Sequence, residues 1–148
     1  MDNKEKQILV TVINLFLIFG CYSLYVYNTY IVVNFNIIND FKFWAKVFLI
    51  LIPVTIVSQI IIHIIFAIIN KIVTNEDMST LKDERDRLID LKAVRISHWT
   101  STAGFLLSMV SQLIGLPPYA MFLTLIASGF ISGIATEVAK IYFYRKGF

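Results

Sequence analysis

The sequence predicts an all-α membrane protein, built as one domain over residues 1–148 from a bundle of four transmembrane helices. Two observations carry this prediction: hydrophobic residues make up 57% of the chain, and the mean hydropathy is +0.74. A helix needs about 20 apolar residues to cross the hydrocarbon core of a bilayer. The chain has four apolar runs of about this length or more, at residues 8–33, 43–69, 97–116 and 119–142.

The basic residues predict how these spans are oriented. Of the 13 Lys and Arg, all except Lys42 and Lys46 lie near the N-terminus, in the central polar segment or near the C-terminus. Four spans bring these three regions to one side, and Lys and Arg accumulate in cytoplasmic loops. We therefore expect a multi-pass protein of the cytoplasmic membrane with both termini inside the cell. Because topology accounts for the positive charge, we expect no nucleic-acid partner.

The first span carries several polar residues at heptad-compatible spacings, which place them along one helix face. They are Thr11, Asn14, Cys21, Tyr25 and Asn28. A cysteine after an apolar run also resembles a lipoprotein cleavage site. Because the hydrophobic run continues well past Cys21, we favour an uncleaved first helix.

The central segment predicts a charged helix at about residues 80–96 that continues into the third span. Ser79 and Thr80 provide helix-start chemistry, and no Gly or Pro follows before residue 104. The sequence therefore predicts one long helix from about 80 to 115, whose first turns project into the cytoplasm.

The segment Asp83–Ser97, with the sequence DERDRLIDLKAVRIS, is the most distinctive stretch of the chain. It resembles the D-E-R-D-x-x-I-x-x-K-x-x-R-I juxtamembrane motif of an uncharacterised family of small prokaryotic four-helix membrane proteins. The likeness covers about 15 residues and the span that follows. It implies membership of a group that has no assigned activity.

Three carboxylates of this segment, Asp83, Asp86 and Asp90, stand at i, i+3 and i+7 on one helix face. Such a face could hold a divalent cation through oxygen ligands. A solvated face with paired charges is the interpretation we favour, because alternating charges are typical of exposed helices. We therefore expect no metal, and we take Asp83, Asp86, Arg87 and Asp90 as a candidate docking face for a partner or a second copy.

Small residues in the third and fourth spans predict close helix packing. In lipid, small side chains at this spacing let a neighbouring backbone approach closely, which favours helix association. The stripe in the third span and the motif in the fourth comprise Ser97, Ser101, Gly104, Ser108, Ser111 and Gly115, and Gly129 and Gly133. Pro117 and Pro118 between the two spans predict an antiparallel hairpin.

A candidate polar cluster lies within the spans. Gln59 and His63 are separated by one helical turn in the second span, and Glu137 lies near the cytoplasmic end of the fourth. Polar groups at such depths are costly and point into the bundle. The three side chains could form a proton or ion relay, or they could serve packing through hydrogen bonds between helices, and we favour packing.

The sequence contains no phosphate-binding glycine loop, nucleophile elbow or HExxH motif. We therefore expect no enzymatic activity and no cofactor; an intramembrane enzyme acting on lipid would have only the region of Glu137 and His98 to use. The leading hypothesis is an oligomerising or accessory membrane subunit, with the lipid bilayer and a second copy or another membrane or cytoplasmic protein as partners. The alternative is a small homo-oligomeric ion or proton channel or transporter.

Overall fold

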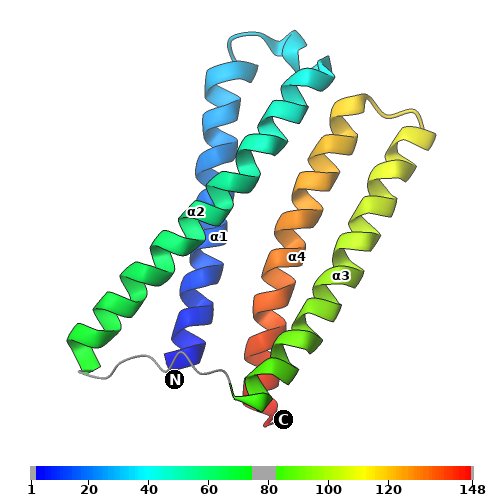
Figure 1. Ribbon diagram of the computed structural model, residues 1–148. Helices are drawn as coiled ribbons and strands as arrows, with labels where there is room; N and C mark the ends of the chain where they lie inside the picture. Colours follow the sequence, from blue (N-terminus) through cyan, green and yellow to red (C-terminus); the bar gives the residue numbers. More distant parts are fainter. Residues whose placement is uncertain (1–2, 75–82, 148) are drawn as a thin grey trace.

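Every regular element in the computed structural model is a helix (Figure 1), within residues 3–74 and 83–147, which are the residues that the structure describes. In chain order the elements are α1 (Asn3–Val26), the π-helix η1 (Tyr27–Ile31), the 3-10 helix η2 (Phe35–Asn39), α2 (Phe41–Thr74), α3 (Glu84–Leu113) and α4 (Pro118–Lys146). The predicted all-α class is confirmed.

The four long helices form two antiparallel hairpins, α1 with α2 and α3 with α4 (Figure 1). The hairpins are joined mainly by α1, which packs against both α2 and α4. Within the described residues, the backbone of α3 approaches that of α4 alone. The start of α1, the end of α2, the start of α3 and the end of α4 lie at the same end of the bundle (Figure 1), and we call this the terminal end; the opposite end is the loop end.

Three helical segments in the described ranges are long and apolar enough to cross a membrane: Lys4–Ile31, Phe41–Val73 and Pro118–Lys146. The third span that the sequence predicts, residues 97–116, lies mostly in α3, which ends at Leu113, and is not among them. The reason is its composition, because Ser, Thr and Gln residues interrupt the apolar run.

The charged segment starts its helix later than the sequence predicts. Asp83 is the N-cap of α3, and its side chain and that of Asp86 form a reciprocal capping box. Such a box satisfies backbone N–H groups that have no partner within the helix. Ser79 and Thr80, where we predicted the start, lie outside the described residues. From Glu84 the helix runs without a break into the apolar part, as the sequence predicts.

Small residues bring α3 close to α4. Gly104 lies so near α4 that an added Cβ would fall 2.0 Å from the Cβ of Ser128. Ser108 and Ser111 are buried, and the hydroxyls of Ser97 and Ser132 lie 2.7 Å apart. Ser128 and Ser132 therefore belong to the surface of α4 that contacts α3.

Other members of the predicted stripes lie elsewhere. Ser101 is exposed, and Gly115 has a φ of 79°, which favours glycine and ends α3 in a turn. Gly129 faces open space, whereas Gly133 packs against Leu15 of α1. The two predicted stripes therefore do not face each other.

Aromatic residues join the two hairpins at the loop end. Trp44 of α2 is buried and stacks on Phe122 of α4, with ring centroids 5.9 Å apart. Its indole Nε1 donates a hydrogen bond of 2.7 Å to the carbonyl of Ile38. The Tyr22 hydroxyl of α1 donates to the carbonyl of Val47 at 2.8 Å. The loop end is thus held by a packed aromatic core, whereas polar contacts dominate the terminal end.

Candidate functional site

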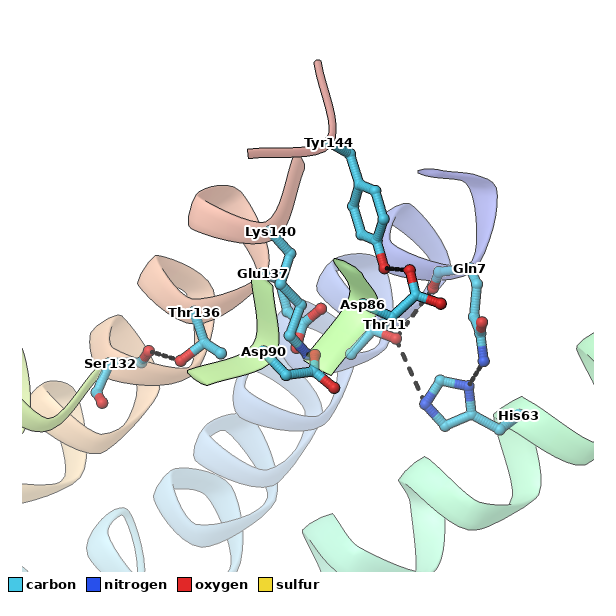
Figure 2. Close-up of polar contacts among 10 residues, drawn as sticks. All are labelled: Gln7, Thr11, His63, Asp86, Asp90, Ser132, Thr136, Glu137, Lys140 and Tyr144. Carbon is cyan, nitrogen blue, oxygen red and sulfur yellow. Dashed lines mark hydrogen bonds and ion pairs between the residues drawn. The ribbon is translucent and has the colours of Figure 1, made fainter. Parts of the chain in front are cut away.

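Two polar clusters lie toward the terminal end of the bundle, and Figure 2 draws Asp86 and Tyr144 of the first and Gln7, Thr11 and His63 of the second. The first, which we call the clasp, joins α1, α3 and α4 and comprises Lys4, Glu5, Arg85, Asp86, Tyr144 and Arg145. The second, which we call the seam, lies between α1 and α2 and comprises Gln7, Thr11, Asn14, Ser58, Gln59 and His63.

Asp86 is the centre of the clasp. Its side chain is buried, with 8% of its surface exposed, and it accepts hydrogen bonds from two other helices. Lys4 Nζ of α1 lies 2.5 Å from Oδ2, and the Tyr144 hydroxyl of α4 donates to Oδ1 at 2.9 Å. One carboxylate therefore holds three helices together.

Further contacts extend the clasp along the same end. Arg145 Nε donates to Glu5 Oε1 at 2.9 Å, which ties α4 to α1. Arg85 donates to the backbone carbonyl of Tyr144 at 3.1 Å, which ties α3 to α4. This last contact satisfies a carbonyl in the final turn of α4 that has no partner within the helix.

The clasp lowers the pKa of the Asp86 carboxyl below its ordinary value. Burial by itself raises this pKa, because it disfavours the charged form. The hydrogen bonds from Lys4 and Tyr144, the Lys4 charge and the backbone N–H of Asp83 together outweigh burial. The carboxylate is therefore ionised when the clasp is closed, as charge-assisted hydrogen bonding requires.

One turn further along α3, Asp90 also faces the chain's own helices. Lys140 Nζ of α4 lies 3.8 Å from Asp90 Oδ1 and 2.9 Å from Glu137 Oε1. Asp86 and Asp90 thus belong to the contact between α3 and the rest of the bundle. Of the four residues of the predicted docking face, only Asp83 and Arg87 are exposed. Because Asp86 is buried, its inclusion in an exposed face was wrong.

The three acidic residues that we considered for a cation are not arranged as a metal site. Among the described residues, no group of three or more His, Cys, Asp or Glu side chains could hold a metal ion. Asp86 and Asp90 contact cationic groups of the same chain, Lys4 and Lys140.

His63 is the titratable residue of the seam. Its ring lies between Gln7 and Thr11 of α1 (Figure 2), with Nδ1 3.4 Å from Gln7 Nε2 and Nε2 3.4 Å from Thr11 Oγ1. The Thr11 hydroxyl donates to the Gln7 carbonyl at 3.0 Å, so it accepts from the histidine. The tautomer with a proton on Nε2 satisfies both contacts.

Asn14 and Ser58 continue the seam toward the middle of the helices. Ser58 Oγ donates to Asn14 Oδ1 at 3.0 Å. Asn14 is buried, with 7% of its surface exposed. Thr11 and Asn14 therefore face the bundle, whereas Cys21, Tyr25 and Asn28, which we predicted on the same helix face, are exposed.

The structure divides the predicted polar cluster between two places. His63 and Gln59 belong to the seam, whereas Glu137 pairs with Lys140 on α4. The two regions are both visible in Figure 2, where Glu137 lies beside Lys140 and Asp90 rather than beside the histidine.

Sequence reasoning did not connect several residues that complete these clusters. The spacing of Thr11 and Asn14 placed them on one helix face, but it did not identify His63 as their neighbour. For Lys4, Glu5 and Arg145 the only signal was their position at the ends of apolar runs. Because such residues usually serve topology, their role as partners of α3 and α4 was missed.

No known family model matches this chain, and neither a curated protein nor a solved structure is significantly similar to it. The function is therefore inferred from the geometry of the chain.

Proposed function

We propose that this chain is a four-span protein of the cytoplasmic membrane that assembles with a second copy or with another membrane or cytoplasmic protein, and that it performs no enzymatic reaction. Its assembly surface is the outward face of the first turns of α3.

The pairing of α3 with α4 supports a fourth span. The two helices run antiparallel, with close contact from Ser97–Ser132 to Gly104–Ser128 and a turn of few residues between them. If α4 crosses the bilayer, then α3, which is tightly packed against it, crosses the bilayer as well. The Ser and Thr residues of α3 are compatible with a position inside the bilayer, because several of their hydroxyls form hydrogen bonds within the chain. Ser108 Oγ, for example, donates to the Phe105 carbonyl at 2.7 Å.

The charge distribution supports an orientation with the terminal end in the cytoplasm. Lys4, Arg85, Lys140 and Arg145 lie at this end. Lys42 lies beside Asp40 at the loop end, where its backbone N–H donates to the Asp40 carboxylate at 2.9 Å. The excess of basic residues at the terminal end is what cytoplasmic loops carry.

The observation that carries the proposed assembly role is an exposed apolar stripe on the start of α3. Leu88, Leu91 and Val94 are 58%, 68% and 58% exposed. They follow one another at three-residue intervals on the side opposite the buried Ile89 and Ala93. We call Leu88, Leu91 and Val94 the outer stripe.

The outer stripe would lie outside the hydrocarbon core, in the part of α3 that precedes the span. Large apolar side chains grouped in water are unfavourable, and grouped exposure of this kind marks interaction sites. Arg87 and Arg95 beside the stripe are also exposed. A partner helix with an apolar face and acidic flanks fits this surface.

The test is assembly of purified protein in mild detergent. We expect the protein mass of the particle, without its bound detergent, to exceed the 17.0 kDa of one chain. The particle would be either a homo-oligomer or a complex with a stoichiometric partner. The double variant Leu88→Asp/Leu91→Asp should release the monomer and still reach the membrane, because both side chains point away from the bundle. The conservative variant Leu88→Met/Leu91→Met keeps the apolar surface and should assemble as wild type.

A monomeric wild-type particle without a partner would contradict the proposal, and so would complexes that the Asp variant leaves unchanged. The identity of the co-purified chain separates the two forms of the proposal. A second copy means oligomerisation, and a different protein means an accessory subunit.

The seam supports a second candidate, a homo-oligomeric channel or transporter for protons or ions. His63 and Gln59 are polar side chains in membrane-spanning segments, where such groups mark transport routes. Purified protein in liposomes should then pass protons or ions, and His63→Ala should change the pH dependence of the flux. Vesicles that stay tight across a pH series would remove this candidate.

A further inference from the structure

Two buried polar atoms of the seam have no hydrogen-bond partner among the described residues: Asn14 Nδ2 and Gln59 Oε1. One is a donor and the other is an acceptor. Leaving a buried donor or acceptor unsatisfied costs about 1–3 kcal/mol, and in hydrocarbon there is no bulk water to relieve it.

The register of the hairpin places the two residues at a similar level. His63 lies opposite Gln7 and Thr11, and Ser58 lies opposite Asn14. Because α1 and α2 run antiparallel, Gln59 falls beside the Ser58–Asn14 contact. Gln59 also shares a helix face with His63, one turn away, and this face is turned toward α1.

We infer that the seam holds a buried water molecule, which accepts a hydrogen bond from Asn14 Nδ2 and donates one to Gln59 Oε1. A water is the small ligand that offers both functions at once. Buried waters make about three hydrogen bonds, and Ser58 Oγ, which donates to Asn14 Oδ1, keeps acceptor capacity for the second proton of the water.

A direct bond between the two amides is the obvious alternative, and the structure does not show it: neither atom has a partner within the described residues. A metal cation is a poor occupant, because Asn14 Nδ2 is a donor and would repel it. An apolar occupant would leave both atoms unsatisfied. The chemistry of the pair therefore favours water over the other small occupants.

The inferred site has a consequence for His63. The water lies about one helical turn, or ~6 Å of helix rise, from the histidine. It extends the row of hydrogen-bonding groups from Gln7 at the terminal end to the middle of the hairpin. This inference is independent of the proposed assembly role, because the outer stripe and the seam lie on different helices.

The test is magnetisation transfer from water to side-chain amides, measured by solid-state NMR on the full-length, isotope-labelled protein in lipid vesicles. We expect transfer from water to the amide groups of both Asn14 and Gln59. In the variant Asn14→Leu the water loses its donor, so transfer to Gln59 should fall at least several-fold. The matched variant Ile60→Leu alters the lipid-facing neighbour of Gln59 and should leave the transfer unchanged.

Absence of transfer to both amides in the wild-type protein would overturn the inference, since the seam would then be dry. Transfer to Gln59 that persists in Asn14→Leu would overturn it as well, because Gln59 would be hydrated without the bridge. The spectra of backbone amides in α1 and α2 verify that the variant keeps its helices, so a misfolded protein is recognised and cannot be mistaken for either result.

Discussion

A single side chain, Asp86, joins three of the four long helices. Its carboxylate accepts a hydrogen bond from the backbone N–H of Asp83, which caps α3. It also pairs with Lys4 of α1 and accepts a hydrogen bond from the Tyr144 hydroxyl of α4. Buried carboxylates are favourable only when their partners satisfy them. The contribution of Asp86 to stability therefore depends on contacts with residues that are far away in the sequence.

Replacing this carboxylate should destabilise the protein. Asp86→Asn removes the charge that Lys4 and Tyr144 recognise, and hydrogen bonds to charged groups contribute about 1.5–3 kcal/mol. We expect a loss of this order in thermal or denaturant unfolding in detergent micelles near neutral pH. Asp83→Asn is the matched control, because Asn is also a good N-cap and Asp83 is exposed. Equal stability of the two variants would refute the role of the clasp.

The contribution of Asp86 should also depend on pH. Its pKa is lowered in the folded protein, so its stabilisation is present above the unfolded value of about 4 and is lost as the pH falls through the folded value. The stability difference between wild type and Asp86→Asn should therefore shrink when the pH is lowered below about 4. A difference that stays constant between pH 7 and pH 3 would contradict the lowered pKa.

The inward orientation of Asp86 could not be predicted from the sequence. Asp86 stands among alternating charges, a pattern that is typical of solvated helices. Its partner Lys4 is 82 residues away, and sequence spacing within a helix carries no information about such a contact. The cap did have a local signal, because Asp86 follows Asp83 by three residues, but we predicted the helix start at Ser79 and Thr80.

At the scale of the elements, α3 and α4 form the most extensive pairing among the described helices. Gly104 is the position where the helices allow no side chain, since an added Cβ would overlap Ser128. Without a hydrophobic driving force between helices in lipid, such close approach supplies the van der Waals contact that holds them together. The hairpin therefore depends on this glycine more than on any of the others.

Gly104→Ala should separate α3 from α4 and destabilise the protein by about 1–3 kcal/mol, the usual effect of overpacking. Gly129→Ala is the control, since nothing lies within 4 Å of the Cβ it would add. Alanine favours a helix over glycine by about 1 kcal/mol, so this variant should be neutral or more stable. Thermal unfolding in detergent measures both, and similar effects of the two substitutions would show that the described contact is incorrect.

The sequence predicted the small-residue period but could not rank its members. Ser101 and Gly104 both fit the stripe, yet Ser101 is exposed and Gly104 is buried. The spacing defines a stripe of small residues that is wider than the surface in contact with α4. Which of these residues touch α4 depends on the angle at which the two helices cross. The hairpin itself was predictable because Pro117 and Pro118 lie between the two spans, and Pro118 begins α4.

At the scale of the whole molecule, the two ends of the bundle are stabilised by different kinds of interaction. The loop end is closed by the aromatic cluster around Trp44 and Phe122, which excludes water and depends on burial. The terminal end is closed by charged and polar groups around Asp86. Conditions that weaken ion pairs, such as high salt or low pH, should therefore loosen the terminal end first.

The proposed topology can be tested with single cysteines in a Cys21→Ser background, which removes the chain's one cysteine. A membrane-impermeant thiol reagent applied to intact cells should label Leu116→Cys in the turn between α3 and α4. Asp83→Cys at the start of α3 should react only after the cells are opened. Labelling of both positions from the same side would show that α3 does not cross the membrane.

The contact between Glu5 and Arg145 joins residues 140 positions apart. During synthesis the two residues are therefore added to the chain at very different times. Chains elongate at about 5–20 residues per second, so Glu5 is added roughly 7–28 s before Arg145. Until then the first helix has neither this partner nor the Tyr144 side of the clasp. The terminal end of the bundle is therefore completed late in biogenesis. For much of the synthesis α4 is absent, and water or lipid headgroups must take its place around the acidic and basic groups in the first turn of α1.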